Sequence, residues 1–120
     1  MNDLFVSIKA SGPWAILQIA GEIDLNTAPK LKEAIIGSLK DGFRKIALDL
    51  TNVGFLDSTG LAAMVSGVRR ANEASGGLVL INPNEHIQRI LAVTDLGKIF
   101  PVFDNAESLP TTMNAQQLRS

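Results

Sequence analysis

Hydrophobic and polar residues alternate along the first part of the chain in a pattern that predicts a β-hairpin. Leu4, Val6 and Ile8 alternate with other residues, which is the period of a strand with one buried face. Residues 11–13, Ser-Gly-Pro, are typical of a turn, and the largely apolar stretch 14–20 that follows is predicted to be a second strand. Because the connection between them is short, the two strands should be antiparallel.

After the hairpin, helical and strand-like segments alternate. A helix should begin near Pro29, where Asn26 or Thr27 could cap it, and should end near Asp41. Strands that alternate with helices imply crossover connections and a largely parallel sheet. The sequence therefore predicts an α/β fold, with a mixed sheet of four to five strands and three to four helices. The remaining predicted elements are a strand over 46–50, a loop over 51–56, a helix over 58–74, a strand over 78–81, a short helix that closes near Gly97 and an edge strand over 99–103.

Composition and charge narrow the class of protein. A chain of 120 residues fits a single domain, which we expect over residues 1–110, with a polar, flexible tail over 111–120. The chain has no cysteine, which excludes disulfides and thiolate nucleophiles and suits a reducing cytoplasm. The net charge of −1 and the lack of a basic stripe argue against direct binding of nucleic acid. No apolar run approaches the ~20 residues of a membrane helix, so we expect no membrane insertion and a cytoplasmic location.

The segment with the most distinctive chemistry is Asp-Ser-Thr-Gly at residues 57–60, at the predicted start of a helix. The first N–H groups of a helix have no internal partner, and the peptide dipoles place about half a positive charge there. Either Asp57 or Ser58 could cap these groups, and a phosphate on Ser58 would meet donors from its own helix. Gly60 would let another surface approach the backbone closely.

Two interpretations of this segment remain open from the residues alone. Asp57 and Ser58 can be a simple N-cap pair, which composition favours because both residue types are preferred caps. Two details favour a binding site instead. The stretch 53–56 before the motif is mostly apolar, and small residues follow it on the helix. That small-residue face could be a docking surface or could pack against a neighbouring helix, and it consists of Ala62, Ala63, Ser66 and Gly67.

The motif also resembles a known family. Residues 55–61, Phe-Leu-Asp-Ser-Thr-Gly-Leu, are similar to the signature of the STAS family of anti-sigma factor antagonists, and residues 21–24, Gly-Glu-Ile-Asp, resemble its second block. Residues 46–50 and 76–80 resemble its central and fourth strands. The resemblance spans about residues 4–103 and implies the STAS fold, with its mixed sheet and N-terminal hairpin.

What the resemblance implies is a bacterial partner switch that regulates transcription. The unphosphorylated antagonist binds an anti-sigma factor serine/threonine kinase, and this releases the sigma factor. Phosphorylation at Ser58, rather than Thr59, ends the binding, and a serine phosphatase resets the system. The kinase holds the ATP, so neither a cofactor nor enzymatic activity is expected in this chain. The residues implied in the phosphosite loop and in partner binding are Asp24, Phe55, Leu56, Asp57, Ser58, Thr59, Gly60, Leu61 and Ala62.

Rival functions fit the sequence less well. A serine hydrolase needs glycine two residues before its nucleophile, but that position is Leu56, and His86 is expected to be a surface residue. A phosphorelay receiver would need clustered acids after its first strand, which are missing here. Asp24, Asp49 and Asp57 are spread over strand ends and could approach one another, but we expect them to be solvated or capping carboxylates and therefore expect no metal site.

An alternative remains within the same family. STAS domains also serve as subunits of phospholipid-transport ATPases and as tails of anion transporters, where the domain is an interaction module without a phospho-switch. Phe55 and Leu56 are the candidates for interface contact.

Overall fold

The computed structural model describes residues 3–110 and confirms the predicted order of strands and helices. The tail predicted for residues 111–120 lies outside the described residues, so the domain boundary at residue 110 stays a prediction. The predicted hairpin is formed by β1 (Leu4–Ser11) and β2 (Trp14–Ile23). The later elements are α1 (Ala28–Lys40), β3 (Lys45–Leu56), α2 (Ser58–Glu73), β4 (Gly77–Ile81), α3 (Glu85–Val93) and β5 (Val102–Phe103), with short 3-10 helices at Leu96–Ile99 and Ala106–Ser108.

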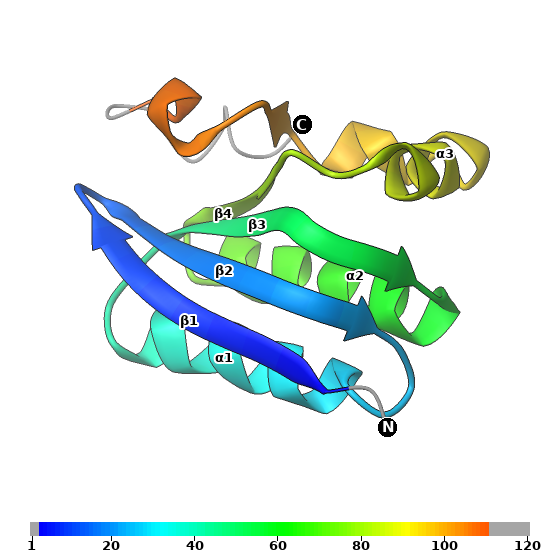
Figure 1. Ribbon diagram of the computed structural model, residues 1–120. Helices are drawn as coiled ribbons and strands as arrows, with labels where there is room; N and C mark the ends of the chain where they lie inside the picture. The colour runs from blue at the N-terminus through cyan, green and yellow to red at the C-terminus, as the bar shows by residue number, and fades with distance from the viewer. Residues whose placement is uncertain (1–2, 111–120) are drawn as a thin grey trace.

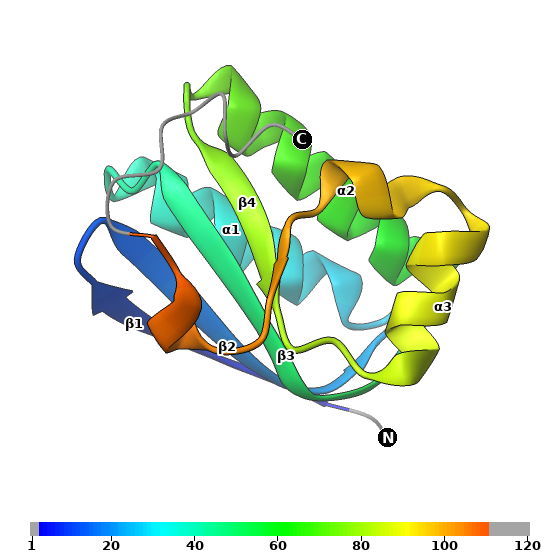
Figure 2. The same cartoon turned by 90° about the horizontal axis from the view of Figure 1, so that it is seen from above.

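The five strands form one sheet in the order β1-β2-β3-β4-β5. The hairpin strands are antiparallel, and every other neighbouring pair is parallel. Helices α1 and α2 lie side by side against one face, while the C-terminal segment crosses the other face (Figures 1 and 2). This arrangement confirms the predicted mixed, largely parallel sheet.

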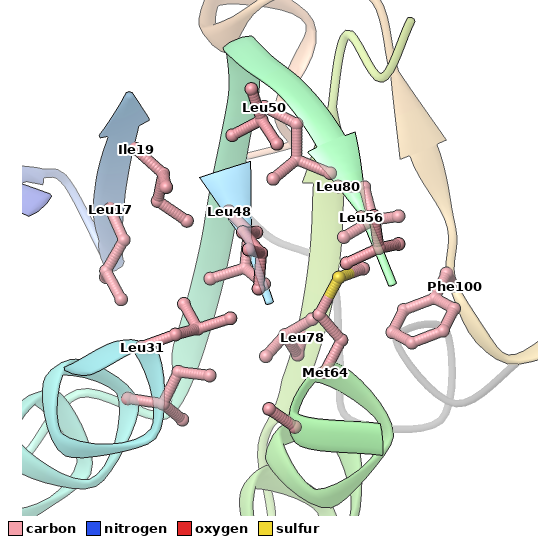
Figure 3. Packing of buried hydrophobic residues seen from close by; sticks show 14 of the residues in the cluster. Leu17, Ile19, Leu31, Leu48, Leu50, Leu56, Met64, Leu78, Leu80 and Phe100 are labelled. Atoms are coloured by element: carbon pink, nitrogen blue, oxygen red, sulfur yellow. The ribbon is translucent and has the colours of Figure 1, made fainter. Parts of the chain in front are cut away.

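The main core fills the space between the sheet and the two long helices. Leu17 of β2 and Leu48 of β3 point toward Leu31 of α1, and Leu78 of β4 points toward Met64 of α2 (Figure 3). All five side chains are fully buried. Burial of such side chains contributes roughly 1.5–3 kcal/mol each. This core fixes the first turns of both helices beside the ends of β2 and β3.

A smaller cluster of buried residues lies on the other face of the sheet. It joins Trp14 of β2, Val79 and Ile81 of β4 and Leu109 near the end of the described chain. The indole Nε1–H of Trp14 donates a hydrogen bond to the Pro110 carbonyl oxygen at 2.8 Å. The C-terminal segment therefore completes the fold on a face that the long helices do not cover.

Two predicted segments differ in the structure. Residues 51–56, predicted to be a loop, form the second half of β3, because β2 continues to Ile23 and pairs with them up to Leu56. The pairing shifts register twice, between Gln18 and Ala20 and between Gly21 and Glu22 of β2, and each shift accommodates one extra residue of β3. The edge strand predicted over 99–103 is reduced to Val102–Phe103, because residues 96–99 turn into a 3-10 helix.

Candidate functional site

Asp57 alone connects the end of β3 to the start of α2, and it determines how the two elements meet. Its Oδ1 accepts a hydrogen bond from the Gly60 N–H at 2.8 Å, which is the N-cap interaction of the helix. Its Oδ2 accepts from the Leu25 N–H at 3.2 Å, and its own N–H donates to the Ile23 carbonyl at 3.1 Å. Asp57, rather than Ser58, is therefore the cap, and it also fastens α2 to the segment that follows β2.

Ser58 is the first residue of α2 and is exposed to solvent. Within residues 3–110, its hydroxyl makes no hydrogen bond, and the N–H groups of Ser58 and Thr59 have no acceptor. The first turn of α2 carries no acidic residue. The hydroxyl is thus accessible, and it lies beside two unused donors at the positive end of a 16-residue helix.

Asp24 forms the neighbouring turn between β2 and α1. Its Oδ1 accepts hydrogen bonds from the N–H groups of Asn26, at 2.9 Å, and Thr27, at 3.1 Å. The Thr27 hydroxyl donates to the Glu22 carbonyl at 2.7 Å and accepts from the Asp24 N–H at 2.9 Å. Thr27 occupies the N-cap position of α1 without a side-chain capping bond. Asp24 thus shapes the turn that presents Leu25 to Asp57.

Several residues of the motif are buried and support the site from beneath. Leu56 is only 2% exposed and lies in the main core, together with Leu61. A Cβ on Gly60 would lie 2.5 Å from the carbonyl oxygen of Ile23, so the surface that approaches this glycine is the chain's own β2. The predicted contacts of Leu56, Gly60 and Leu61 with a partner stay a prediction. Because the three residues are buried, they would support the binding surface from beneath.

The small-residue face of α2 divides into two parts. A Cβ on Gly67 would lie 2.8 Å from Cδ1 of Ile35 and 3.1 Å from Cδ1 of Leu78, so this part packs against α1 and β4. Ala63 is buried as well, whereas Ala62 is exposed. The face therefore packs against α1 at Gly67, is half-exposed at Ser66 and is open at Ala62, one turn after Ser58.

Beside that open part lies a shallow, mostly apolar hollow of about 280 Å³ between the starts of α1 and α2. Its most prominent residue is Leu25, which is 68% exposed although it is a large apolar side chain. Sequence reasoning missed this surface, and the exposed leucine directly after the 21–24 block is the signal that could have indicated it. The hollow is lined by Leu25, Ala28, Pro29, Lys32, Thr59, Ala62 and Ala63.

Comparison with known proteins shows the family of this chain. The sequence profile of the STAS domain matches residues 6–109. The chain belongs to the STAS domain family. Its curated relatives include the anti-sigma-B factor antagonist of Staphylococcus aureus, which is 31% identical over 91 residues, covering 76% of this chain and 84% of that protein. The resemblance drawn from residues 55–61 and 21–24 is confirmed.

Solved structures support the same assignment. An anti-sigma factor antagonist from Mycobacterium paratuberculosis is 25% identical, with a TM-score of 0.77 over 87% of this STAS domain and 88% of that chain. The Bacillus cell fate determinant SpoIIAA in its phosphorylated form is 17% identical, with a TM-score of 0.68 over 87% of this chain and 96% of that one. At that identity the likeness shows the shared fold alone.

The side of the STAS motif that faces α3 is held by ring stacking and a helix cap. Phe55, which is 40% exposed, stacks on His86 with ring centroids 5.7 Å apart and an interplanar angle of 15°. The Asn84 Nδ2–H donates to the Val53 carbonyl at 3.1 Å. His86 is an exposed residue, as predicted. These contacts anchor the start of α3 to the last residues of β3.

The Asp49 side chain of this STAS domain hydrogen-bonds to a residue close to it in the sequence. The Asp49 carboxylate accepts hydrogen bonds from the Thr51 hydroxyl, at 2.6 Å, and from the Thr51 N–H, at 3.1 Å, in its own strand. Among residues 3–110, no cluster of His, Asp and Glu side chains has the makings of a metal site. In the same part of the chain, every helix is too short or too polar to span a bilayer.

Proposed function

We propose that this STAS domain is an anti-sigma factor antagonist that works by partner switching. Its unphosphorylated form binds an anti-sigma factor serine/threonine kinase and thereby releases a sigma factor, and phosphorylation of Ser58 ends the binding. The observation that carries the proposal is the division of roles at the start of α2. Asp57 caps the helix, which leaves the Ser58 hydroxyl exposed and unbonded among the described residues. The relatives from Staphylococcus aureus and Staphylococcus epidermidis are anti-sigma-B factor antagonists, which supports the same function.

The geometry supports an effect of phosphate on the surface rather than on the fold. A phosphoserine adds a charge of about −1.5 to −2, which the free N–H groups of Ser58 and Thr59 can receive. The same charge would stand beside the Asp57 carboxylate and at the rim of the hollow that contains Leu25. A partner seated on this surface would have to desolvate the phosphate. A loss of about 3 kcal/mol would weaken binding by more than a hundredfold.

The remaining parts of the proposal follow from this role. The domain is a substrate of the kinase and not an enzyme, so it needs no cofactor of its own. A serine phosphatase would restore the binding form. Both partners would meet the domain in the cytoplasm, and the domain would influence transcription without contacting DNA.

The proposal is tested by incubation with candidate anti-sigma factor kinases and ATP, followed by mapping of the phosphorylated residue. We expect phosphate on Ser58. Ser58→Ala should abolish it, whereas Ser11→Ala, at another exposed serine, should not. If neither Ser58 nor Thr59 is phosphorylated by any cognate kinase, the switch is wrong.

Binding measurements separate the switch from the alternative within the family. Ser58→Ala should bind the kinase constitutively, and Ser58→Asp should bind poorly, because it places a negative charge where the phosphate would be. Equal binding by the two variants would favour a passive module, such as the STAS subunit of a phospholipid- or anion-transport system.

A further inference from the structure

Strand β1, with eight residues, is the longer of the two edge strands of the sheet, and the Lys30 ammonium of α1 lies over its Phe5 ring, 5.7 Å from the centroid. It pairs with β2 on one side along Leu4–Ser11 and has no neighbouring strand on the other side among the described residues (Figure 1). The opposite edge is β5, which is only two residues long and directly follows Pro101. A long edge strand presents a row of unpaired N–H and C=O groups, which another strand can bind. The two edges of the sheet therefore differ in their capacity to pair.

The side chains of β1 add to this capacity. Phe5 is 66% exposed and Ile8 is 52% exposed, although both are large apolar residues. The pairing of Val6 with Ile19 and of Ile8 with Leu17 places even-numbered residues of β1 on the face that the helices cover. Odd-numbered residues lie on the other face.

We propose that a second copy of this chain pairs with β1 in antiparallel fashion, with the two-fold axis at Val6. In this register Asp3 faces Lys9 of the second copy, Leu4 faces Ile8, and Phe5 faces Ser7. Even-numbered residues face even-numbered residues, so the apolar face of one sheet continues into that of the other. The register is isologous, so the Asp3–Lys9 pair occurs twice.

Charge complementarity selects this register. Opposite charges directly across an antiparallel pair stabilise it, and like charges destabilise it. An axis at Ser7 would instead place Asp3 opposite Ser11 and Phe5 opposite Lys9. A lysine on an edge strand normally discourages pairing. With the axis at Val6, the negative charge of Asp3 on one copy offsets the positive charge of Lys9 on the other.

The proposal is independent of the switch at Ser58. The hollow beside Ser58 is formed by α1, α2 and the segment between β2 and α1, and β1 contributes no residue to it. If Ser58 is not phosphorylated, the proposed dimer is therefore not contradicted. If the chain does not dimerise, the proposed switch is not contradicted.

The first test measures self-association by sedimentation velocity over a hundredfold range of protein concentration. We expect a reversible dimer. Asp3→Lys and Lys9→Glu should each weaken it about tenfold, because each converts two attractive pairs into repulsive ones. The double variant, which exchanges the two charges, should restore it. Lys40→Glu, an exposed charge reversal on α1, serves as the control and should leave the dimer unchanged. A monomer at every concentration would overturn the proposal, as would a double variant that fails to recover.

The second test determines the register by disulfide cross-linking, which is unambiguous because the chain has no cysteine. With the axis at Val6, the two Cα atoms of Val6→Cys would lie about 5 Å apart, and those of Ser7→Cys about 8 Å apart. Cysteines whose Cα atoms are separated by more than about 7 Å do not form a disulfide without backbone movement. We therefore expect mild oxidation to cross-link Val6→Cys but not Ser7→Cys. A cross-link at Ser7→Cys or Phe5→Cys alone would overturn the register.

Discussion

The starts of α2 and α3 have the same side-chain capping geometry but differ in the residue that follows the cap. In each helix an Asp or Asn side chain caps the N–H three residues later, at 2.8 Å from Asp57 to Gly60 and at 2.9 Å from Asn84 to Ile87. Each capping side chain also binds a second segment, the Leu25 N–H for Asp57 and the Val53 carbonyl for Asn84. Both capping side chains therefore fasten their helix to a second segment of the domain.

The first helical residue distinguishes them. In α3 it is Glu85, a permanent carboxylate at the positive end of the helix. In α2 it is Ser58, and the only acid at that start is the cap itself. The α3 start thus carries its compensating charge in the sequence, whereas the α2 start offers a hydroxyl where charge can be added. The two helix starts therefore share a capping geometry and differ in the charge of the residue that follows the cap.

Substitution of the third residue of α2 should have the largest effect on the free energy of unfolding. Gly60 in α2 lies where Ile87 lies in α3, and a Cβ there would be 2.5 Å from the Ile23 carbonyl and 2.8 Å from Cδ1 of Leu56. Gly60→Ala should lower the free energy of unfolding by about 3 kcal/mol, as overpacking does in tight cores. Urea denaturation measures the change. Gly37→Ala in α1, where a Cβ meets nothing within 4 Å, is the control and should be neutral or stabilising. Tolerance of Gly60→Ala would contradict the close packing of α2 on β2.

The next effect concerns binding and rests on the proposed function. Leu25→Ala should weaken binding of the kinase partner by about 2 kcal/mol, or about 30-fold, because it removes a large apolar side chain of the hollow that is 68% exposed. Val93→Ala, at an exposed apolar residue of α3, is the control and should bind normally. Isothermal titration calorimetry compares the two. Equal affinities would show that the partner does not use the hollow.

Loss of either cap should have a smaller and nearly equal effect. Asp57→Ala and Asn84→Ala should each lower the free energy of unfolding by about 1 kcal/mol, the usual contribution of a capping side chain. Asp57→Asn should recover part of the loss, because its amide oxygen can still accept from the Gly60 N–H. Thermal unfolding followed by circular dichroism measures all three. A much larger loss at one helix would show that the two starts are not equivalent.

The smallest effect tests the charge at the first helical residue. Glu85→Gln should destabilise the domain by about 0.4 kcal/mol, and Ser58→Glu should stabilise it by a similar amount at low salt, because a carboxylate near a helix N-terminus is favourable. Both changes should diminish as salt is added. Ser58→Gln, which has the same shape without the charge, is the matched control. Changes of the same sign at the two helices would contradict the comparison.

Local patterns were sufficient to predict most of the fold. Alternation at Leu4, Val6 and Ile8 and the turn at residues 11–13 define the hairpin without reference to the rest of the chain. The second half of β3 was missed for a physical reason. Asn52 and Gly54 are poor strand formers, and they adopt the strand conformation because β2 pairs alongside them, a contact that no local pattern encodes.

The site was predicted in its chemistry but not in its shape. The motif indicated Ser58 and its cap, but it could not distinguish Asp57 from Ser58 as the capping residue, because both types serve equally well. The hollow beside Ser58 depends on the approach of α1 to α2, and Leu25 and Pro29 enter it from a different part of the sequence. The opposite environments of Leu56 and Phe55 do not follow from simple alternation either, because two register shifts in the β2–β3 pairing leave every third residue buried, at Leu50, Val53 and Leu56.

The unequal pairing along β3 has a consequence for motion. Lys45–Asp49 lie between β2 and β4, but within the described part of the chain residues 51–56 have a strand neighbour only in β2. On the side away from β2, the Asn84 amide is bonded to the Val53 carbonyl in place of a strand. Amide protons in this outer half should therefore exchange with solvent through local openings that leave the inner half protected. We therefore expect the strand that leads to Ser58 to open more readily at its tip than at its base, and under the proposed switch this would let a kinase reach the serine while the inner half of the strand stays paired.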